Sequence, residues 1–159
     1  MKSNPLSKSA TAETLKKISS QWNIELPKTK TLMEHEIEDD ASLITGDGFA
    51  AIKVGETYLP FLSEPTLLEK FPRVVVDMGA VKFVCNGATV MRPGIKNYSE
   101  FEKDQIVCVS EESHSKFLAV GRSLVSSKEM PTMTKGEVIK NLHHVSDRFW
   151  EAAKMIKSV

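Results

Sequence analysis

The chain has 159 residues, of which 41% are hydrophobic and 26% are charged, and its 21 basic and 21 acidic side chains give a formal net charge of zero. This length accommodates one ordinary domain or two small lobes that share an interface. No apolar run approaches the roughly 20 residues of a membrane-spanning helix, and the polar N-terminal residues lack the apolar core of a secretory signal, so we expect a cytoplasmic protein with no membrane partner.

Charge is unevenly distributed along the chain. Lysine and arginine are in excess in residues 1–33 and 113–159, whereas acidic residues are in excess in residues 34–72. If this distribution survives folding, it predicts a dipolar molecule with one face for phosphate and another for a different partner. An ordinary solvated surface explains the same pattern, because charges that are close in sequence need not be close in the folded protein.

The first half of the chain predicts a small lobe of helix and sheet. After a polar lead at residues 1–9, Ser9 or Thr11 can cap a helix whose apolar residues lie three and four apart, and Pro27 ends it. An edge strand at 31–37 follows, and then a meander of short antiparallel strands joined by glycine-containing turns. The strands of the meander are expected at 43–45, 49–54 and 57–61.

The second half predicts mainly strands. A short helix that begins at Ser63 and closes at Pro72 links it to the first lobe, and Ser146 can cap a final helix. Between them we expect a strand at 73–77, a helix at 78–85, an extended loop at 87–95, and strands at 105–110, 117–125 and 137–145. Short strands at close spacing with few helices favour a small barrel of mainly antiparallel pairs.

Two glycines, Gly87 and Gly94, bracket a loop that ends in Met-Arg-Pro-Gly. Glycines at these positions let backbone amides and a guanidinium group approach a large ligand closely, which suits a phosphate backbone. Each glycine is equally well explained by a turn that needs a positive φ angle.

Residues that could carry catalysis lack the partners that catalysis requires. Cys85 lies in an apolar run, and the three serines between positions 123 and 127 show no recognisable nucleophile motif. Asp77 could act as a general base at a strand end, but its position before a helix favours a structural carboxylate that accepts backbone amides. Cys108 also lies in an apolar run, and we expect both cysteines to be buried and reduced.

The histidines do not predict a metal site. His143 and His144 lie close to Asp147, but adjacent residues on a strand point to opposite faces and no third ligand is suitably spaced. His35 stands among glutamates in no better pattern. We expect no metal and no other cofactor, a half-buried histidine at 143 or 144, and a helix cap at Asp147.

Five aromatic residues could stack on nucleobases. Their helical spacing with other apolar residues favours packing in the core instead. These residues are Trp22, Phe71, Phe83, Phe149 and Trp150.

Four segments of the chain resemble a PUA domain, a module named after pseudouridine synthase and archaeosine transglycosylase. They are residues 76–84, the Gly-Ala-Thr-Val-Met-Arg-Pro-Gly-Ile stretch at 87–95, Ala-Val-Gly-Arg at 119–122, and residues 136–150. Among PUA proteins the chain resembles the malignant T-cell-amplified sequence family and its archaeal relatives, whose C-terminal His-x-x-x-Asp-x-x-Trp pattern matches His143, Asp147 and Trp150. The resemblance implies an α+β fold, with a pre-PUA α+β lobe at 1–72 and a PUA-type β pseudobarrel with a C-terminal helix at 73–159.

PUA domains bind structured RNA, so the resemblance implies a non-catalytic protein that recognises a tRNA-like or ribosomal RNA helix in translation or RNA modification. Carried over by position, the family's RNA surface lies on the helix at 78–85 and the loop after it. The residues so placed are Lys82, Gly87, Ala88, Met91, Arg92, Pro93, Gly94 and Lys96, with Arg122 as a weaker candidate. Lys82, Arg92 and Lys96 would neutralise phosphates, although Arg92 could equally be an exposed side chain beside the Pro-Gly turn.

Two other functions fit the same sequence. The acidic stretch at 34–72 and exposed strand edges would let the chain act as an adaptor that holds a ribosomal or initiation-factor-like protein. An RNA-modification enzyme that lacks its partner subunit is a third alternative, but the chain carries no transglycosylase or synthase pattern, and we expect no enzyme activity.

Overall fold

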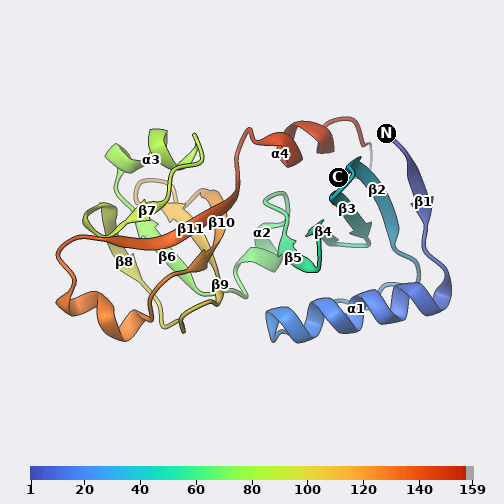
Figure 1. Ribbon diagram of the computed structural model, residues 1–159, viewed down its shortest axis with the longest axis horizontal. Helices are drawn as coiled ribbons and strands as arrows, with labels where there is room; N and C mark the ends of the chain where they lie inside the picture. Colours follow the sequence, from blue (N-terminus) through green and yellow to red (C-terminus); the bar gives the residue numbers. More distant parts are fainter. Residues whose placement is uncertain (157–159) are drawn as a thin grey trace.

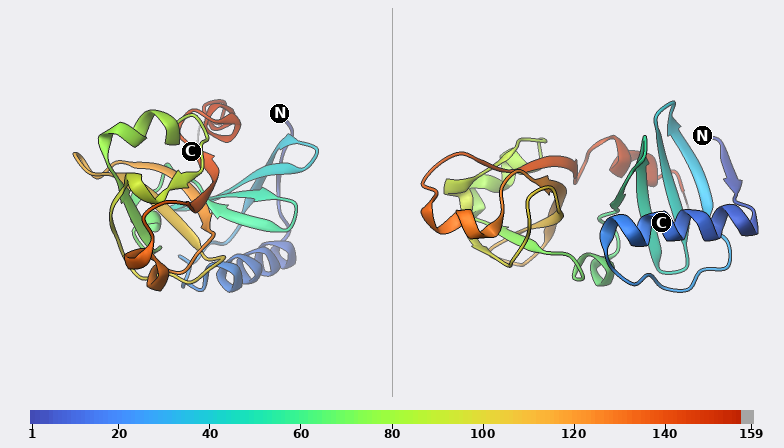
Figure 2. Two further views of the ribbon diagram at one scale, coloured as in Figure 1. Left: turned by 60° about the vertical axis from the view of Figure 1, so that its left-hand side comes forward. Right: turned by 60° about the horizontal axis from the view of Figure 1, so that its bottom comes forward.

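The computed structural model describes residues 1–156 and shows two β-sheets that lie next to each other (Figure 1). The N-terminal sheet has five antiparallel strands in the order β1-β2-β3-β4-β5, with α1 against one face and α4 against the other (Figure 2). The strands are β1 (Ser3–Pro5), β2 (Met33–Glu38), β3 (Ala41–Gly46), β4 (Phe49–Val54) and β5 (Thr57–Pro60), and the helices are α1 (Lys8–Trp22) and α4 (Arg148–Ala153).

The start of the chain differs from the sequence prediction. Residues of the expected polar lead form β1, which pairs with β2 and replaces it as the edge strand of the sheet. Ser7, not Ser9 or Thr11, caps α1, because its hydroxyl accepts a hydrogen bond at 3.1 Å from the backbone N–H three residues later. The helix ends at Asn23, whose left-handed φ of 54° stops it before the expected end at Pro27.

The C-terminal sheet has six strands in the order β7-β11-β10-β9-β6-β8 and curls into a near-closed pseudobarrel. β6 pairs with β9 in parallel, and the other neighbouring pairs are antiparallel. The strands are β6 (Arg73–Val76), β7 (Val90–Met91), β8 (Ile95–Tyr98), β9 (Ile106–Glu111), β10 (Phe117–Ser123) and β11 (Glu137–His144). The expected α+β fold with a β pseudobarrel is therefore confirmed.

Short helices complete the second half of the chain. α2 (Pro65–Leu68) links the two sheets, with Glu64 and not Ser63 at its N-cap, and α3 (Met78–Val84) follows β6 as expected. The expected extended loop at 87–95 instead contains β7, the 3-10 helix η1 (Arg92–Gly94) and the start of β8. A second 3-10 helix, η2 (Ser127–Thr132), and β8 have sequences too short for periodicity to reveal.

Two clusters of buried apolar residues lie side by side. One fills the pseudobarrel, with Val74, Val109 and Ile139 among its members. The other packs around the N-terminal sheet and also includes Phe149 from α4 and Cys108 from β9. Because the second cluster takes residues from both halves of the chain, the two sheets share a continuous buried contact. The division into domains at residue 72 stays a prediction, and residues 157–159 lie outside the described part of the chain.

Most of the aromatic residues pack as the sequence predicts. Trp22, Phe71 and Phe149 are buried, and Trp150 is half-buried against the first cluster. The prediction is wrong for Phe83, which is 63% exposed. α3 is a short helix that turns its single buried residue, Val84, toward the pseudobarrel, and the residue before it on a helix points about 100° away.

Candidate nucleic-acid interface

α3 is held firmly against the loop that follows it. Asp77 caps the helix, because its Oδ1 accepts a hydrogen bond at 2.9 Å from the Ala80 N–H, which confirms the structural role expected for this carboxylate. The backbone N–H of Asp77 donates at 2.9 Å to the carbonyl of Gly94 at the end of η1. A Cβ added to Gly94 would lie 3.3 Å from the Cβ of Ala80, so only a residue without a side chain fits this close approach comfortably.

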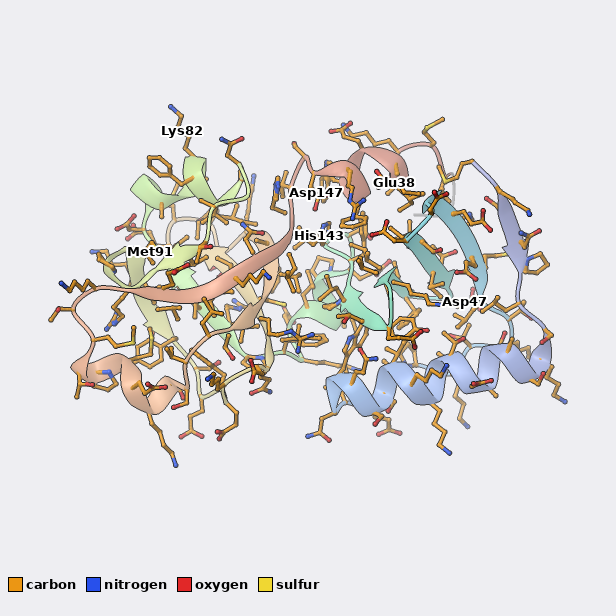
Figure 3. All side chains as sticks on the ribbon, in the orientation of Figure 1. Glu38, Asp47, Lys82, Met91, His143 and Asp147 are labelled. Atoms are coloured by element: carbon orange, nitrogen blue, oxygen red, sulfur yellow. The ribbon has the colours of Figure 1, made fainter. Side chains whose placement is uncertain are left out.

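A shallow groove of about 410 Å³ opens between α3 and this loop. Two residues of the groove carry large apolar side chains in solvent, Phe83 at 63% exposed and Met91 at 45%, and Met78 at the start of α3 is 46% exposed outside the groove lining. Lys82 is also exposed and points away from the molecule on α3 (Figure 3). The groove is lined by Asp77, Gly79, Ala80, Phe83, Val84, Ala88, Thr89, Val90, Met91, Pro93 and Gly94. An exposed apolar groove next to a free cation suits a ligand with apolar faces and negative charge.

Arg92 is not a free cation on this surface. Its Nε donates at 3.0 Å to the carbonyl of Met130, its Nη1 donates at 3.2 Å to the carbonyl of Ile95, and its guanidinium carbon lies 5.8 Å from the ring centre of Tyr98. These contacts join η1 to η2 and β8. The arginine therefore fixes the conformation of the loop. Its contact with phosphate stays a prediction, and only the N–H groups that are not bonded to these carbonyls could make that contact.

The residues that the sequence predicts to bind RNA do not all lie in one site. Ala88, Met91, Pro93 and Gly94 line the groove, and Lys96 is exposed on β8. Gly87 and Arg122 line a different cleft, beside the junction of the two sheets. Gly87 has a φ of +90°, so it meets the need for a positive φ that the sequence analysis considered, whereas no positive φ occurs at Gly94.

Phe83 and Met78 are surface residues that the sequence did not predict. Their only sequence signal is that a seven-residue helix cannot bury all of its apolar residues against one barrel face. The tertiary structure reveals their exposure.

His143 and Asp147 of the His-x-x-x-Asp-x-x-Trp pattern lie at the junction of the two sheets (Figure 3), where His143 is buried and Asp147 and Trp150 are half-buried. His143 is completely buried and stacks on Phe61, with ring centres 5.1 Å apart. Its Nδ1 donates to the Oδ2 of Asp147 at 2.8 Å, and its Nε2 accepts a hydrogen bond from the Leu62 N–H at 3.3 Å. One imidazole ring thus ties β11 to α4 and to the segment after β5.

Asp147 is the other half of this contact. Its Oδ1 accepts the Trp150 N–H at 2.8 Å, and its Oδ2 also accepts the His144 N–H at 2.9 Å, so it caps α4 as expected; Ser146, which was also considered as a cap, does not. Burial lowers the pKa of His143 more than Asp147 raises it, so the ring is neutral. Burial acts to raise the pKa of Asp147, but the hydrogen bonds from His143 and the backbone outweigh it and leave the pKa below its usual value.

His35 and the two cysteines lie in surroundings that suit a structural role. Burial also lowers the pKa of His35, whose ring nitrogens lie 2.8 Å from the Ser3 hydroxyl and 3.1 Å from the Thr45 hydroxyl. Cys85 and Cys108 are free thiols, half-buried and buried respectively, and burial raises the pKa of Cys108 to about 12. Within residues 1–156, no three metal-ligating side chains gather into a site, and no helix is long and apolar enough to cross a membrane.

A PUA domain is the class of module that this pseudobarrel defines: residues 72–145 match the model of the PUA domain family. The chain is similar to an uncharacterized protein of Methanocaldococcus jannaschii, with 42% identity over 79% of this chain and 78% of that protein. It is also similar to translation machinery-associated protein 20 of Eremothecium gossypii, with 30% identity over 90% of this chain and 84% of that protein.

The fold is shared with a solved hypothetical protein from Pyrococcus horikoshii, at a TM-score of 0.80 and 30% identity over 95% of this chain and 99% of that chain. The chain therefore belongs to the family of translation machinery-associated protein 20 and malignant T-cell-amplified sequence proteins, together with their archaeal relatives. The resemblance described for its motifs is confirmed.

Proposed function

We propose that this protein binds structured RNA through α3 and the loop after it, and that it acts in the cytoplasm in connection with translation. The observation that carries the proposal is the groove beside α3, where apolar side chains stand in solvent next to a lysine with no ion pair among the described residues. PUA domains as a class bind RNA, and two relatives are named for the translation machinery and for a sequence amplified in malignant T cells.

The groove offers both kinds of contact that an RNA strand uses. Phe83 presents a largely exposed ring on which an unstacked base can lie, and Met91 adds a second exposed apolar side chain to the groove. Lys82 and Lys96 are exposed and form no ion pair with any residue in the described range, so they are free to neutralise phosphates. These contacts recognise the shape and the backbone of RNA.

The structure favours binding without catalysis. Asp77, the best candidate for a general base, already accepts the N–H that caps α3. In the closest histidine–carboxylate pair, His143 has no exposed surface for a substrate to reach, and Asp147 already accepts hydrogen bonds from His143 and from two backbone N–H groups. Burial raises the pKa of Cys85, which disfavours the thiolate that nucleophilic attack needs.

RNA binding by the Phe83→Ala variant tests the proposal. With a fluorescent tRNA transcript as the probe, we expect affinity to fall about 10-fold, because one lost base stack is worth ~1–3 kcal/mol. Affinity falls as salt is added, and for Lys82→Ala the plot of log affinity against log salt should be less steep by about 0.7–0.9, the value for one phosphate contact. Arg92 is a poor reporter of binding, because its removal also breaks the bonds that shape the loop.

Matched controls separate this site from general effects. Met155→Ala removes an apolar side chain that is 76% exposed and lies beyond α4, and Lys16→Ala removes one exposed positive charge from α1. Both controls should bind the tRNA transcript like the wild type. If the wild-type protein binds neither tRNA nor a ribosomal RNA hairpin at low salt, the proposed function is wrong and the adaptor alternative replaces it.

A further inference from the structure

A second cleft, of about 510 Å³, lies where the pseudobarrel meets the N-terminal sheet. Its apolar lining comes from both halves of the chain, with Leu59 from β5 and Leu142 from β11. Its walls carry the cationic side chains of Arg122, Lys140 and Arg148. Nothing in the proposed role of α3 uses this cleft.

Two of these cations face each other without an acid between them. Arg122 on β10 and Lys140 on β11 are direct partners in the antiparallel register. Like charges at directly opposed positions of a sheet destabilise it. Neither residue forms a salt bridge within residues 1–156, whereas Arg148 is paired with Glu38 and Asp40. The pair therefore costs stability and has no partner of opposite charge, which is expected where an anion binds.

The backbone around the pair is fitted to this position. The β10–β11 register shifts between Val120 and Gly121, and a Cβ added to Gly121 would come within 2.2 Å of the Lys140 carbonyl oxygen. The strands thus approach each other closely at a bulge, a feature that re-aims neighbouring side chains. Arg122 is oriented further by its Nη1, which donates at 2.8 Å to the carbonyl of Asp104 and leaves its other N–H groups available.

The carboxylate of Asp147 lines the cleft, but it repels an anion less than a carboxylate without hydrogen bonds would. It accepts hydrogen bonds from the ring of His143 and from the backbone N–H groups of His144 and Trp150. These donors offset much of its charge at short range. The free positive charge of Arg122 and Lys140 therefore dominates the open part of the cleft.

The cleft continues the surface of α3. Asn141, the neighbour of Lys140 on β11, donates from its Nδ2 to the carbonyl of Val84 at 2.9 Å and to that of Ala88 at 3.2 Å. Val84 and Ala88 line the α3 groove, and Gly87 between them lines the cleft. A nucleic-acid strand that follows α3 thus reaches the cleft past Gly87, which has no side chain of its own and lies beside the imidazole ring of His144, another residue of the cleft lining.

We propose that the Arg122–Lys140 cleft binds a backbone phosphate of the RNA strand that contacts α3. This inference rests on the proposed RNA-binding function and adds a second contact, at the junction of the two sheets. It explains why the two cations are placed opposite each other, because a phosphate between them removes their repulsion.

The test compares the double variant Arg122→Ala, Lys140→Ala with Lys8→Ala, Lys16→Ala, which removes the same charge from exposed positions on α1. The probe is the fluorescent tRNA transcript, titrated over a range of salt. For the cleft variant we expect about 10-fold weaker binding and a plot of log affinity against log salt that is less steep by about 0.7, the value for one phosphate contact to a single strand. Its thermal stability should stay close to that of the wild type, because the loss of the repulsive pair offsets the loss of the hydrogen bond from Arg122 to the Asp104 carbonyl.

The outcomes distinguish this inference from the function on which it rests. If the cleft variant binds like its α1 control while Phe83→Ala still weakens binding, the phosphate site is wrong and the RNA-binding function stands. If the cleft variant loses binding only together with a large loss of thermal stability, the pair is structural and the inference is also overturned. If the wild-type protein binds no RNA, both proposals fail.

Discussion

The surface of α3 and the junction of the two sheets both contain residues of the family pattern, yet they are opposite in physical character. At the junction, His143 has no exposed surface and both of its ring nitrogens are hydrogen-bonded. On α3, Phe83 and Met78 stand in solvent without any contribution to the core that would explain them. The comparison shows that a shared sequence pattern covers two physically different regions, a buried contact that holds the two sheets together and an exposed surface at which we propose that RNA binds.

Removing the buried imidazole ring of His143 should have the largest effect on stability. His143→Ala leaves a cavity beside Phe61 and deprives the Leu62 N–H of its acceptor, so the free energy of unfolding should fall by about 4 kcal/mol. Urea denaturation measures this change. His114→Ala is the control, because that side chain is 73% exposed, and it should cost less than about 0.5 kcal/mol. Equal losses for the two variants would contradict a structural role for the junction.

Two helix caps sharpen the comparison. Asp147→Ala removes the acceptor of three hydrogen bonds, one of them from the buried His143, and should cost about 3 kcal/mol. Asp77→Ala removes one side-chain bond at the start of α3 and should cost about 1 kcal/mol. Denaturation midpoints of both variants check the difference. A cost at Asp77 as large as that at Asp147 would mean that α3 contributes to the core as much as the junction does.

The pH dependence of stability provides a smaller test. Burial lowers the pKa of His143 and of His35 in the folded protein, so each group binds its proton more readily when the chain is unfolded. Stability should therefore fall as the pH drops below about 6.5, with a slope of at most ~1.4 kcal/mol per pH unit for each histidine. The lowered pKa of Asp147 adds a further loss below its ordinary value of 3.8.

A double variant identifies the source of this slope. Replacing both histidines with glutamine should remove most of the change in unfolding free energy between pH 7 and pH 5, as measured by urea denaturation at each pH. An unchanged slope in that variant would show that other groups titrate in this range and that the neutral state assigned to the buried rings is wrong.

Local patterns were sufficient for the elements that carry their own signal. The spacing of Leu15, Ile18 and Trp22 predicts α1, and the glycine turns predict the β3–β5 meander in the order observed. The order of the PUA motifs predicts the pseudobarrel and identifies the helix and loop that form the groove. The ends of elements were less predictable, because Ser7, Ser9 and Thr11 are all acceptable caps and packing selects among them.

The sequence by itself determined the class of fold, the family and the candidate surface on α3, since these depend on patterns within short stretches of chain. Only the tertiary structure decided that β1 joins the sheet, that Arg92 binds carbonyl groups of η2 and β8, and that Phe83 is exposed. It also brought Arg122 beside Lys140, which lies eighteen positions further along the chain in a neighbouring strand. The physical reason is that strand pairing and the junction of two sheets depend on contacts between distant residues, and no local period of the sequence encodes them.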